Sequence, residues 1–170
     1  IGDIKNMSMN EPTLVITRGL PASGKTTWAK DWASQDPDNR ARVSRDDIRA
    51  NILGYNGVGT RPQEAKVTEL QRIIIRSLLK SNFSVIVDDT NLPNSRVKEF
   101  HRLALENDAA FHVVQFNVTP ETCIARDAKR MKQGHRGVGE DVIRGFATRF
   151  RLESWIETNE DSFLVSTINK

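Results

Sequence analysis

Short apolar runs alternate along the chain with longer segments in which apolar residues recur every three or four positions. The short runs are rich in β-branched residues, which is typical of buried strands, and we expect strands at 13–17, 41–44, 84–88, 111–116 and 162–166. The longer segments predict helices at 27–33, 45–53, 62–80, 92–105, 120–133 and 140–158. This alternation favours right-handed crossovers. The predicted fold class is therefore α/β, a five-stranded parallel sheet with helices on both faces.

Length and composition indicate one globular domain. The chain has 170 residues, of which 38% are hydrophobic and 28% charged, enough to bury a core. No apolar stretch approaches the roughly 20 residues of a membrane span. Residues 1–11 are polar, and we expect a disordered tail or tag remnant there, followed by a single domain over 12–170. The single cysteine, Cys123, excludes an intramolecular disulfide and suits a reducing cytoplasm.

One motif connects the first predicted strand to the first predicted helix. Residues 19–26 read Gly-Leu-Pro-Ala-Ser-Gly-Lys-Thr and fit the pattern G-x-x-x-x-G-K-[ST]. Its two glycines allow backbone N–H groups to surround an anion at the positive end of the helix dipole. Lys25 can reach the outer phosphates of a nucleoside triphosphate, and the Thr26 hydroxyl can bind Mg²⁺. The strand–loop–helix context predicts a nucleotide site rather than a chance glycine-rich turn, with contacts at Gly19, Pro21, Ala22, Ser23, Gly24, Lys25, Thr26 and Thr27.

Acidic side chains follow two predicted strands, at the edge where ligands of parallel sheets bind. Asp88 and Asp89 end the 84–88 run, and we expect at least one of them near Mg²⁺ or its bound water. The alternative for either is a helix cap. Asp46 begins the helix after the second strand, where a kinase needs a carboxylate that accepts a hydroxyl proton. From spacing alone, Asp46 could have that role or could simply stabilise the positive end of the helix dipole. The presence of Asp47 is explained by a capping box with Ser44.

Positive charge is concentrated late in the chain. The net charge is +3, yet residues 126–151 hold eight Lys or Arg against three Asp or Glu. Arg126 and Arg130 share one helical face, and glycines at 134, 137 and 139 supply hinges around His135 and Arg136. Beside a phosphate loop this pattern predicts a basic helical lid, with a solvated helical face as the alternative. We expect Arg126 and Arg130 on the nucleotide phosphates, and Arg130 and Lys25 as catalytic groups that neutralise developing charge.

Four stretches together resemble the kinase domain of bacteriophage-type polynucleotide kinases, a branch of the P-loop kinases. They are the phosphate loop with residues 27–29, Ser-Arg-Asp-Asp-Ile-Arg at 44–49, Asp-Thr-Asn-Leu at 89–92, and Arg126 with Arg130. The match covers nearly the whole chain from Thr13, and the second and third stretches are its most specific parts. The chain has no counterpart of the phosphatase domain of the phage enzyme, so a lone kinase and an excised domain both stay open. A phage origin would place the protein in the cytoplasm of the infected host.

The resemblance implies transfer of the γ-phosphate of ATP, with Mg²⁺, to the 5′-hydroxyl of a DNA or RNA strand. It implies that Asp46 is the general base on that hydroxyl and that Arg49 contacts a phosphate of the acceptor strand. Asp89 and Thr90 would lie in the acceptor site, with Asp89 ordering the hydroxyl or the metal. Asp88 stands where the phage enzyme has a neutral residue, which leaves open which aspartate serves Mg²⁺.

Other acceptors are compatible with the same chemistry. Relatives phosphorylate hydroxymethylated pyrimidines such as 5-hydroxymethyluracil within DNA, RNA carrying an aminoacyl group, or small nucleotides. A nucleotide-gated binding module is the alternative from another functional class, and Asp46 beside the loop argues against it. Binding of a nucleic-acid acceptor should weaken with salt, and the aromatic content of 6% predicts little base stacking. The sequence does not determine the choice between DNA and RNA, the choice between ATP and GTP, or the oligomeric state.

Overall fold

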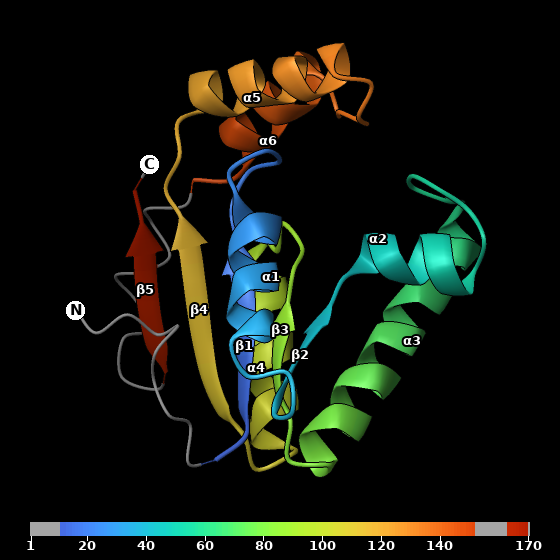
Figure 1. Cartoon of the computed structure of the whole chain (residues 1–170), viewed down its shortest axis with the longest axis vertical. Helices are drawn as coiled ribbons and strands as arrows, with labels where there is room; N and C mark the ends of the chain where they lie inside the picture. Colours follow the sequence, from blue (N-terminus) through green and yellow to red (C-terminus); the bar gives the residue numbers. More distant parts are fainter. Residues whose placement is uncertain (1–10, 152–162, 170) are drawn as a thin grey trace.

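The computed structural model describes residues 11–151 and 163–169 (Figure 1). Five strands form one sheet: β1 (Thr13–Arg18), β2 (Arg40–Val43), β3 (Ser84–Val87), β4 (Ala110–Phe116) and β5 (Leu164–Ile168). Their order is β2-β3-β1-β4-β5, and every neighbouring pair is parallel. β1 lies at the centre, where Ile16 pairs with Val87 of β3 and with Val113 of β4. The predicted five-stranded parallel sheet is confirmed.

Helices connect the successive strands, and some of them lie at the carboxyl end of the sheet. They are α1 (Lys25–Ser34), α2 (Arg45–Asp47), α3 (Arg61–Lys80), α4 (Asn94–Leu105), α5 (Pro120–Lys132) and α6 (Glu140–Arg149), with a π-helical turn η2 (Ile48–Ile52) directly after α2. In Figure 1, α5 and α6 lie together beyond the ends of the central strands, and α2 with η2 lies on the other side of the same end. α1 begins shortly after β1, at this same end of the sheet.

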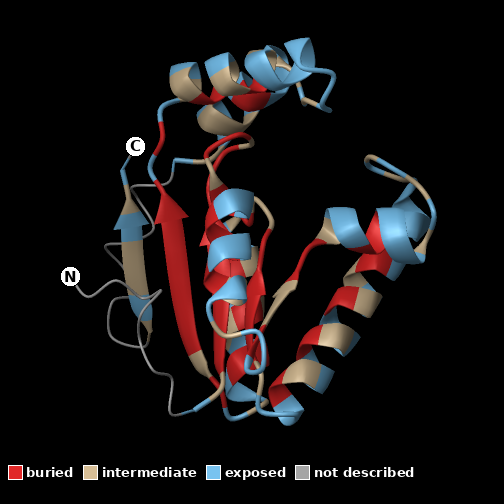
Figure 2. Cartoon of the chain, viewed as in Figure 1, coloured by how far each residue is buried: buried red, intermediate tan, exposed pale blue. Residues whose placement is uncertain are grey.

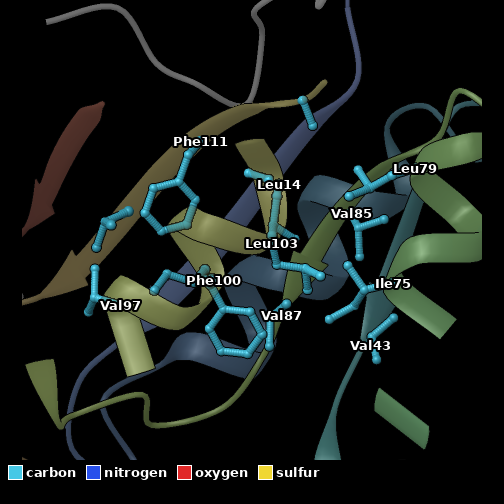
Figure 3. Close-up of a cluster of buried hydrophobic side chains, with 14 of the residues drawn as sticks. Leu14, Val43, Ile75, Leu79, Val85, Val87, Val97, Phe100, Leu103 and Phe111 are labelled. Atoms are coloured by element: carbon cyan, nitrogen blue, oxygen red, sulfur yellow. The ribbon is translucent and has the colours of Figure 1, made fainter. Parts of the chain in front are cut away.

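Two hydrophobic clusters lie on opposite faces of the sheet, because successive side chains of a strand point in opposite directions. Leu14 and Ile16 belong to one cluster, to which α3 and α4 contribute side chains such as Ile75 and Phe100 (Figure 3). Val15 belongs to the other cluster, together with residues of α1, α5 and α6. The prediction of helices on both faces is therefore confirmed. Figure 2 shows that the inner strands β1, β3 and β4 are buried, whereas the edge strand β5 is partly exposed.

Segment 45–53 is not the regular α-helix that its pattern predicts. The N–H of Leu53 donates to the carbonyl of Ile48, five residues back, which is the hydrogen bond of a π-helix. Two successive residues are buried in this turn, Ile48 in the hydrophobic core and Arg49 among charged side chains. The wider turn satisfies both environments at once, and hydrophobic periodicity does not encode the second of them.

Several element boundaries differ from the predicted ones. α1 begins at Lys25, two residues early, because the carbonyl of Gly24 already accepts the first helical hydrogen bond, from the N–H of Trp28 at 3.2 Å. β5 spans Leu164–Ile168 rather than 162–166, and residue 162 lies outside the described part of the chain. The helix expected at 140–158 ends earlier, because α6 stops at Arg149 and Phe150 has extended backbone. Residues 152–158, like the tail at 1–10, fall outside the described residues. Among the residues described, no helix has the length and apolar character needed to cross a membrane.

Candidate functional site

The phosphate loop between β1 and α1 is a tight turn with left-handed backbone at two positions. The φ angle is 62° at Ala22 and 100° at Gly24, the residue that precedes α1. A glycine at position 24 adopts this conformation without the steric cost of a Cβ. The N–H of Gly19 donates to the carbonyl of Thr90 at 3.0 Å and so attaches the loop to the segment after β3. The turn leaves the N-terminus of α1 open toward the carboxyl end of the sheet, the position that favours an anion.

Lys25 is the first residue of α1 and is only 7% exposed. Its ammonium donates to the carbonyl of Leu20 and to the hydroxyl of Ser23, so the side chain curls back into the loop. Burial lowers the pKa of Lys25 to about 8, against the attraction of Asp88 and Asp89. An ammonium that has lost much of its water, beside a helix N-terminus, gains from any anion that enters the loop.

Three further residues of the predicted nucleotide site, Pro21, Thr26 and Thr27, lie in the loop or in the first turn of α1. Thr26 and Thr27 are exposed in the first turn of α1, and Pro21 is half-buried. The hydroxyl of Thr26 donates to Oδ1 of Asp88 at 3.3 Å, which brings the end of β3 to the start of α1. Two hard oxygen groups therefore stand together beside the loop, which are the ligands that Mg²⁺ prefers.

The neighbouring aspartates after β3 have different surroundings. Asp88 is buried and receives Nε and Nη2 of Arg42 at 2.8 and 2.7 Å, in addition to the Thr26 hydroxyl. Asp89 turns toward α2, where it accepts from the N–H of Arg45 at 3.0 Å and from the amide of Gln71 at 2.7 Å. Burial raises the pKa of Asp89 to about 6. Asp88 thus faces the phosphate loop, and Asp89 faces the helix that carries Asp46.

Asp46 stands in the first turn of α2 with a side chain that is 80% exposed. Its Oδ1 accepts from Nη1 of Arg49 at 2.9 Å. The other side of the Arg49 guanidinium donates to Glu64 of α3, and Glu64 also accepts from Arg45 and from the N–H of Gly59. The hydrogen bonds from Arg49, followed by those from Arg45 and Gly59, hold the pKa of Glu64 well below its usual range. The Asp46 carboxylate is therefore oriented by a fixed cation and still open to solvent.

The capping box expected at Ser44 is only half formed. The Ser44 hydroxyl accepts from the N–H of Asp47 at 3.1 Å, as predicted. The Asp47 carboxylate does not complete the box, because it pairs with Nη1 of Arg42. Arg42 therefore links Asp47 and Asp88 across the ends of β2 and β3.

The basic segment forms α5 and α6 at the carboxyl end of the sheet (Figure 1). Arg126 is half-buried, and its Nη1 approaches the carbonyl of Ser23 in the phosphate loop at 3.5 Å. Arg130 lies one turn further along α5 and is exposed. Buried Asp127, between them in sequence, accepts from the N–H groups of Val138 and Gly139. This carboxylate fastens the loop after α5 back onto α5, so loop and helix form one element.

A cavity of about 350 Å³ lies beside the phosphate loop. Its lining is mainly apolar and comprises Leu20, Asn117, Val118, Thr119, Pro120, Ala147, Phe150 and Arg151. Leu20 belongs to the phosphate loop itself, and Thr119 and Pro120 begin α5. The volume and the apolar lining are in the range of small-molecule sites.

Sequence reasoning missed several residues that hold the site together. Glu64 orients Arg49, Gln71 and the N–H of Arg45 hold Asp89, Arg42 holds Asp88, and Asp127 holds the lid loop. Glu64 gives no local signal, because it is one of two carboxylates on a long helix whose capping box is made by Thr60 and Gln63. Asp127 could have been noticed as a lone acid between the two lid arginines.

A phosphate loop at the end of the central strand, a parallel sheet with β3 beside β1, and a basic helical lid define the P-loop kinase class. A family model described as an AAA domain matches residues 14–152, and the chain belongs to that family. It has the P-loop kinase fold, a fold that binds nucleoside triphosphates.

Relatives with assigned names are similar over most of this chain. It is 27% identical over 148 residues to the L-seryl-tRNA(Sec) kinase of Methanococcus maripaludis, covering 84% of this chain and 55% of the relative. In the structure of the Pnkp1/Rnl/Hen1 RNA repair complex, one chain is 28% identical with a TM-score of 0.74, covering 86% of this chain and 46% of that one. A kinase structure from Chloroflexus aurantiacus, 17% identical with a TM-score of 0.68 over 95% and 87% of the two chains, shows the shared fold alone. The chain spans about half the length of the first two relatives.

Proposed function

We propose that the chain transfers the γ-phosphate of ATP to the 5′-hydroxyl of a DNA or RNA strand. The observation that carries this proposal is the Asp46 carboxylate, exposed in the first turn of α2 and held by Arg49. An ATPase needs only a group that positions water, whereas a kinase needs a carboxylate open to a bulky alcohol. The similarity to a chain of an RNA repair complex at 28% identity supports a nucleic-acid acceptor.

The chain's own residues then have distinct tasks in the transfer. Asp46 accepts the proton of the acceptor hydroxyl as its oxygen bonds to the γ-phosphorus, and the bond from that phosphorus to the β–γ bridging oxygen breaks to release ADP. Lys25 and the lid arginines Arg126 and Arg130 neutralise charge on the transferring group. Asp89 and Thr90 border the acceptor side.

The oxygen groups of Thr26 and Asp88 fit Mg²⁺, since they stand 3.3 Å apart beside the phosphate loop. When bound, the ion would neutralise charge on the phosphate oxygens. We assign the metal role to Asp88 rather than Asp89, because Asp88 contacts Thr26 beside the phosphate loop, whereas Asp89 accepts from Arg45 and Gln71 on the side of α2. The cavity beside Leu20 would receive the nucleobase of the donor, since it adjoins the phosphate loop and its lining is mainly apolar.

A panel of acceptors with γ-labelled ATP tests the proposal. The panel contains a DNA and an RNA oligonucleotide with free 5′-hydroxyls, and a 5′-phosphorylated DNA with one internal 5-hydroxymethyluracil. We expect label on the first two acceptors, and about 10²- to 10⁴-fold slower labelling when Asp46→Asn replaces the wild type. Label on the modified DNA alone would refute the 5′-hydroxyl assignment, and ATP hydrolysis without label on any acceptor would indicate a nucleotide-gated module.

A second acceptor deserves a place in the panel because of the similarity to the archaeal seryl-tRNA kinase. Seryl-tRNA presents a primary hydroxyl on an aminoacyl group, and the same carboxylate could accept its proton. Transfer to seryl-tRNA, with none to uncharged tRNA bearing a 5′-hydroxyl, would replace the proposed acceptor while keeping the roles of Lys25 and Asp46.

A further inference from the structure

The resemblance implies that the Arg49 guanidinium contacts an acceptor phosphate, but most of its hydrogen-bond donors are already paired within the protein. Its Nε and Nη2 donate to the two oxygens of Glu64, and its Nη1 donates to Asp46. The residue is only 8% exposed. A nucleic-acid acceptor nevertheless carries a phosphate next to the nucleoside whose 5′-hydroxyl reacts, and cations are the groups that bind it. The acceptor side of the site therefore needs a second cation.

The loop that follows η2 forms the rim of the acceptor side. It is attached to the Arg49–Glu64 pair at both ends, since the N–H of Tyr55 donates to the Arg49 carbonyl and the N–H of Gly59 donates to Glu64, each at 3.0 Å. Gly57 lies between these two anchors. Position 57 is therefore in a loop that is held by the same two residues that orient the Asp46 carboxylate.

Arg136 of the lid loop reaches this rim from the other side. A Cβ added to Gly57 would lie 2.9 Å from Nη2 and 3.6 Å from Cζ of Arg136, so the guanidinium packs directly against the glycine. In Figure 1 the loop before α3 and the loop after α5 approach each other at the same end of the molecule. A side chain at position 57 would displace the guanidinium, and the φ of 85° there also favours glycine.

No residue that the structure describes neutralises the charge of Arg136. Over residues 11–151 and 163–169 the structure gives Arg136 neither an ion pair nor a hydrogen bond, although it is exposed at the rim. A planar guanidinium with free N–H donors recognises phosphate with two parallel hydrogen bonds. Its loop is fastened to α5 by Asp127, so the group is carried by the same element as Arg126 and Arg130.

We propose that Arg136 is a specificity-determining residue that binds the phosphate on the 3′ side of the acceptor nucleoside. This inference rests on the proposed function and deepens it: the substrate is a nucleotide or a strand, and a nucleoside without a phosphate is a poor acceptor. One element of the protein then contacts the phosphates of both substrates, the donor through Arg126 and Arg130 and the acceptor through Arg136.

The test compares Arg136→Gln with wild type on two acceptors, a nucleoside 3′-monophosphate and the same nucleoside without phosphate. Wild type should have a higher kcat/KM for the phosphorylated acceptor than for the nucleoside. In Arg136→Gln the ratio of the two kcat/KM values should fall about 10- to 100-fold, mostly through a higher KM, which is the usual effect of losing one charged hydrogen-bonding partner. Arg136→Lys should restore part of the preference. Lys132→Gln, which removes an exposed charge from the same lid, is the matched control.

The readout separates binding of a phosphate from a structural effect, because lid damage would lower activity on both acceptors equally. An equal loss on both acceptors, or an unchanged preference in Arg136→Gln, would overturn the role of Arg136 and leave the proposed function standing. A wild-type chain that phosphorylates neither these acceptors nor 5′-hydroxyl oligonucleotides would overturn both.

Discussion

Glu64 receives two hydrogen bonds from Arg49, Nε to Oε1 at 2.9 Å and Nη2 to Oε2 at 2.6 Å. This bidentate ion pair joins η2 to α3, and it directs Nη1 of Arg49 at Asp46. A carboxylate on one helix thus orients a carboxylate on another through a shared guanidinium. The candidate general base depends on a residue 18 positions away in the sequence.

Glu64→Gln should lower kcat by up to about 10²-fold, the effect of a small misplacement of reacting groups. The neutral amide cannot neutralise Arg49, so the guanidinium turns toward Asp46 and displaces its carboxylate from the orientation that it has in the wild type. Steady-state transfer with a labelled donor measures the change. Glu69→Gln is the control, since Glu69 lies on the same helix and pairs only with exposed Lys66 among the described residues. A wild-type kcat in Glu64→Gln would show that Arg49 orients Asp46 without Glu64.

Asp46→Asn should reduce phosphate transfer by about 10²- to 10⁴-fold while nucleotide affinity stays unchanged. The side chain is exposed, so the substitution leaves the fold intact. Single-turnover transfer and equilibrium binding of a fluorescent nucleotide measure the two quantities separately. Asp47→Asn is the matched control in the same helical turn, because it removes a neighbouring charge that pairs with Arg42. Undiminished transfer in Asp46→Asn would refute the assignment of the general base.

Nucleotide affinity should fall as pH rises through about 8, where Lys25 of the free protein loses its proton. Bound phosphate favours the charged amine, so the complex has a higher pKa and takes up a proton on binding above that pH. The Kd for ADP should rise up to about tenfold per pH unit in this range. Calorimetry at pH 8.5, in two buffers with different ionisation enthalpies, measures the uptake directly. A Kd independent of pH up to 9.5 would contradict the pKa assigned to Lys25.

Asp88→Asn should raise the Mg²⁺ concentration required for half-maximal transfer, by about tenfold, because a charged oxygen beside Thr26 is lost. Thr26→Ala should act on the same ion, so the double variant should show less than the sum of the two effects. Asp89→Asn should leave the Mg²⁺ requirement unchanged and raise the KM of the acceptor. The opposite pattern, with the metal requirement shifted in Asp89→Asn, would exchange the roles of the two aspartates.

Local sequence was sufficient for the main architecture. The β-branched runs and the apolar spacing between them predict five strands and their connecting helices, because each element must bury a face of regular period. The phosphate loop is equally local, since a glycine at 24, Lys25 and Thr26 act within a few residues of one another. The resemblance to polynucleotide kinases likewise rests on short contiguous motifs.

The tertiary structure decided how the charged groups combine. Asp88 and Asp89 are adjacent in sequence, yet they contact different elements of the fold. Asp88 contacts Thr26 beside the phosphate loop, and Asp89 contacts the N–H of Arg45 at the start of α2. The π-helical turn, the attachment of Arg49 to Glu64 and the meeting of Arg136 with Gly57 all depend on contacts between distant segments. Hydrophobic periodicity determines which face of an element is buried, and it carries no information on which cation meets which carboxylate at the end of the sheet.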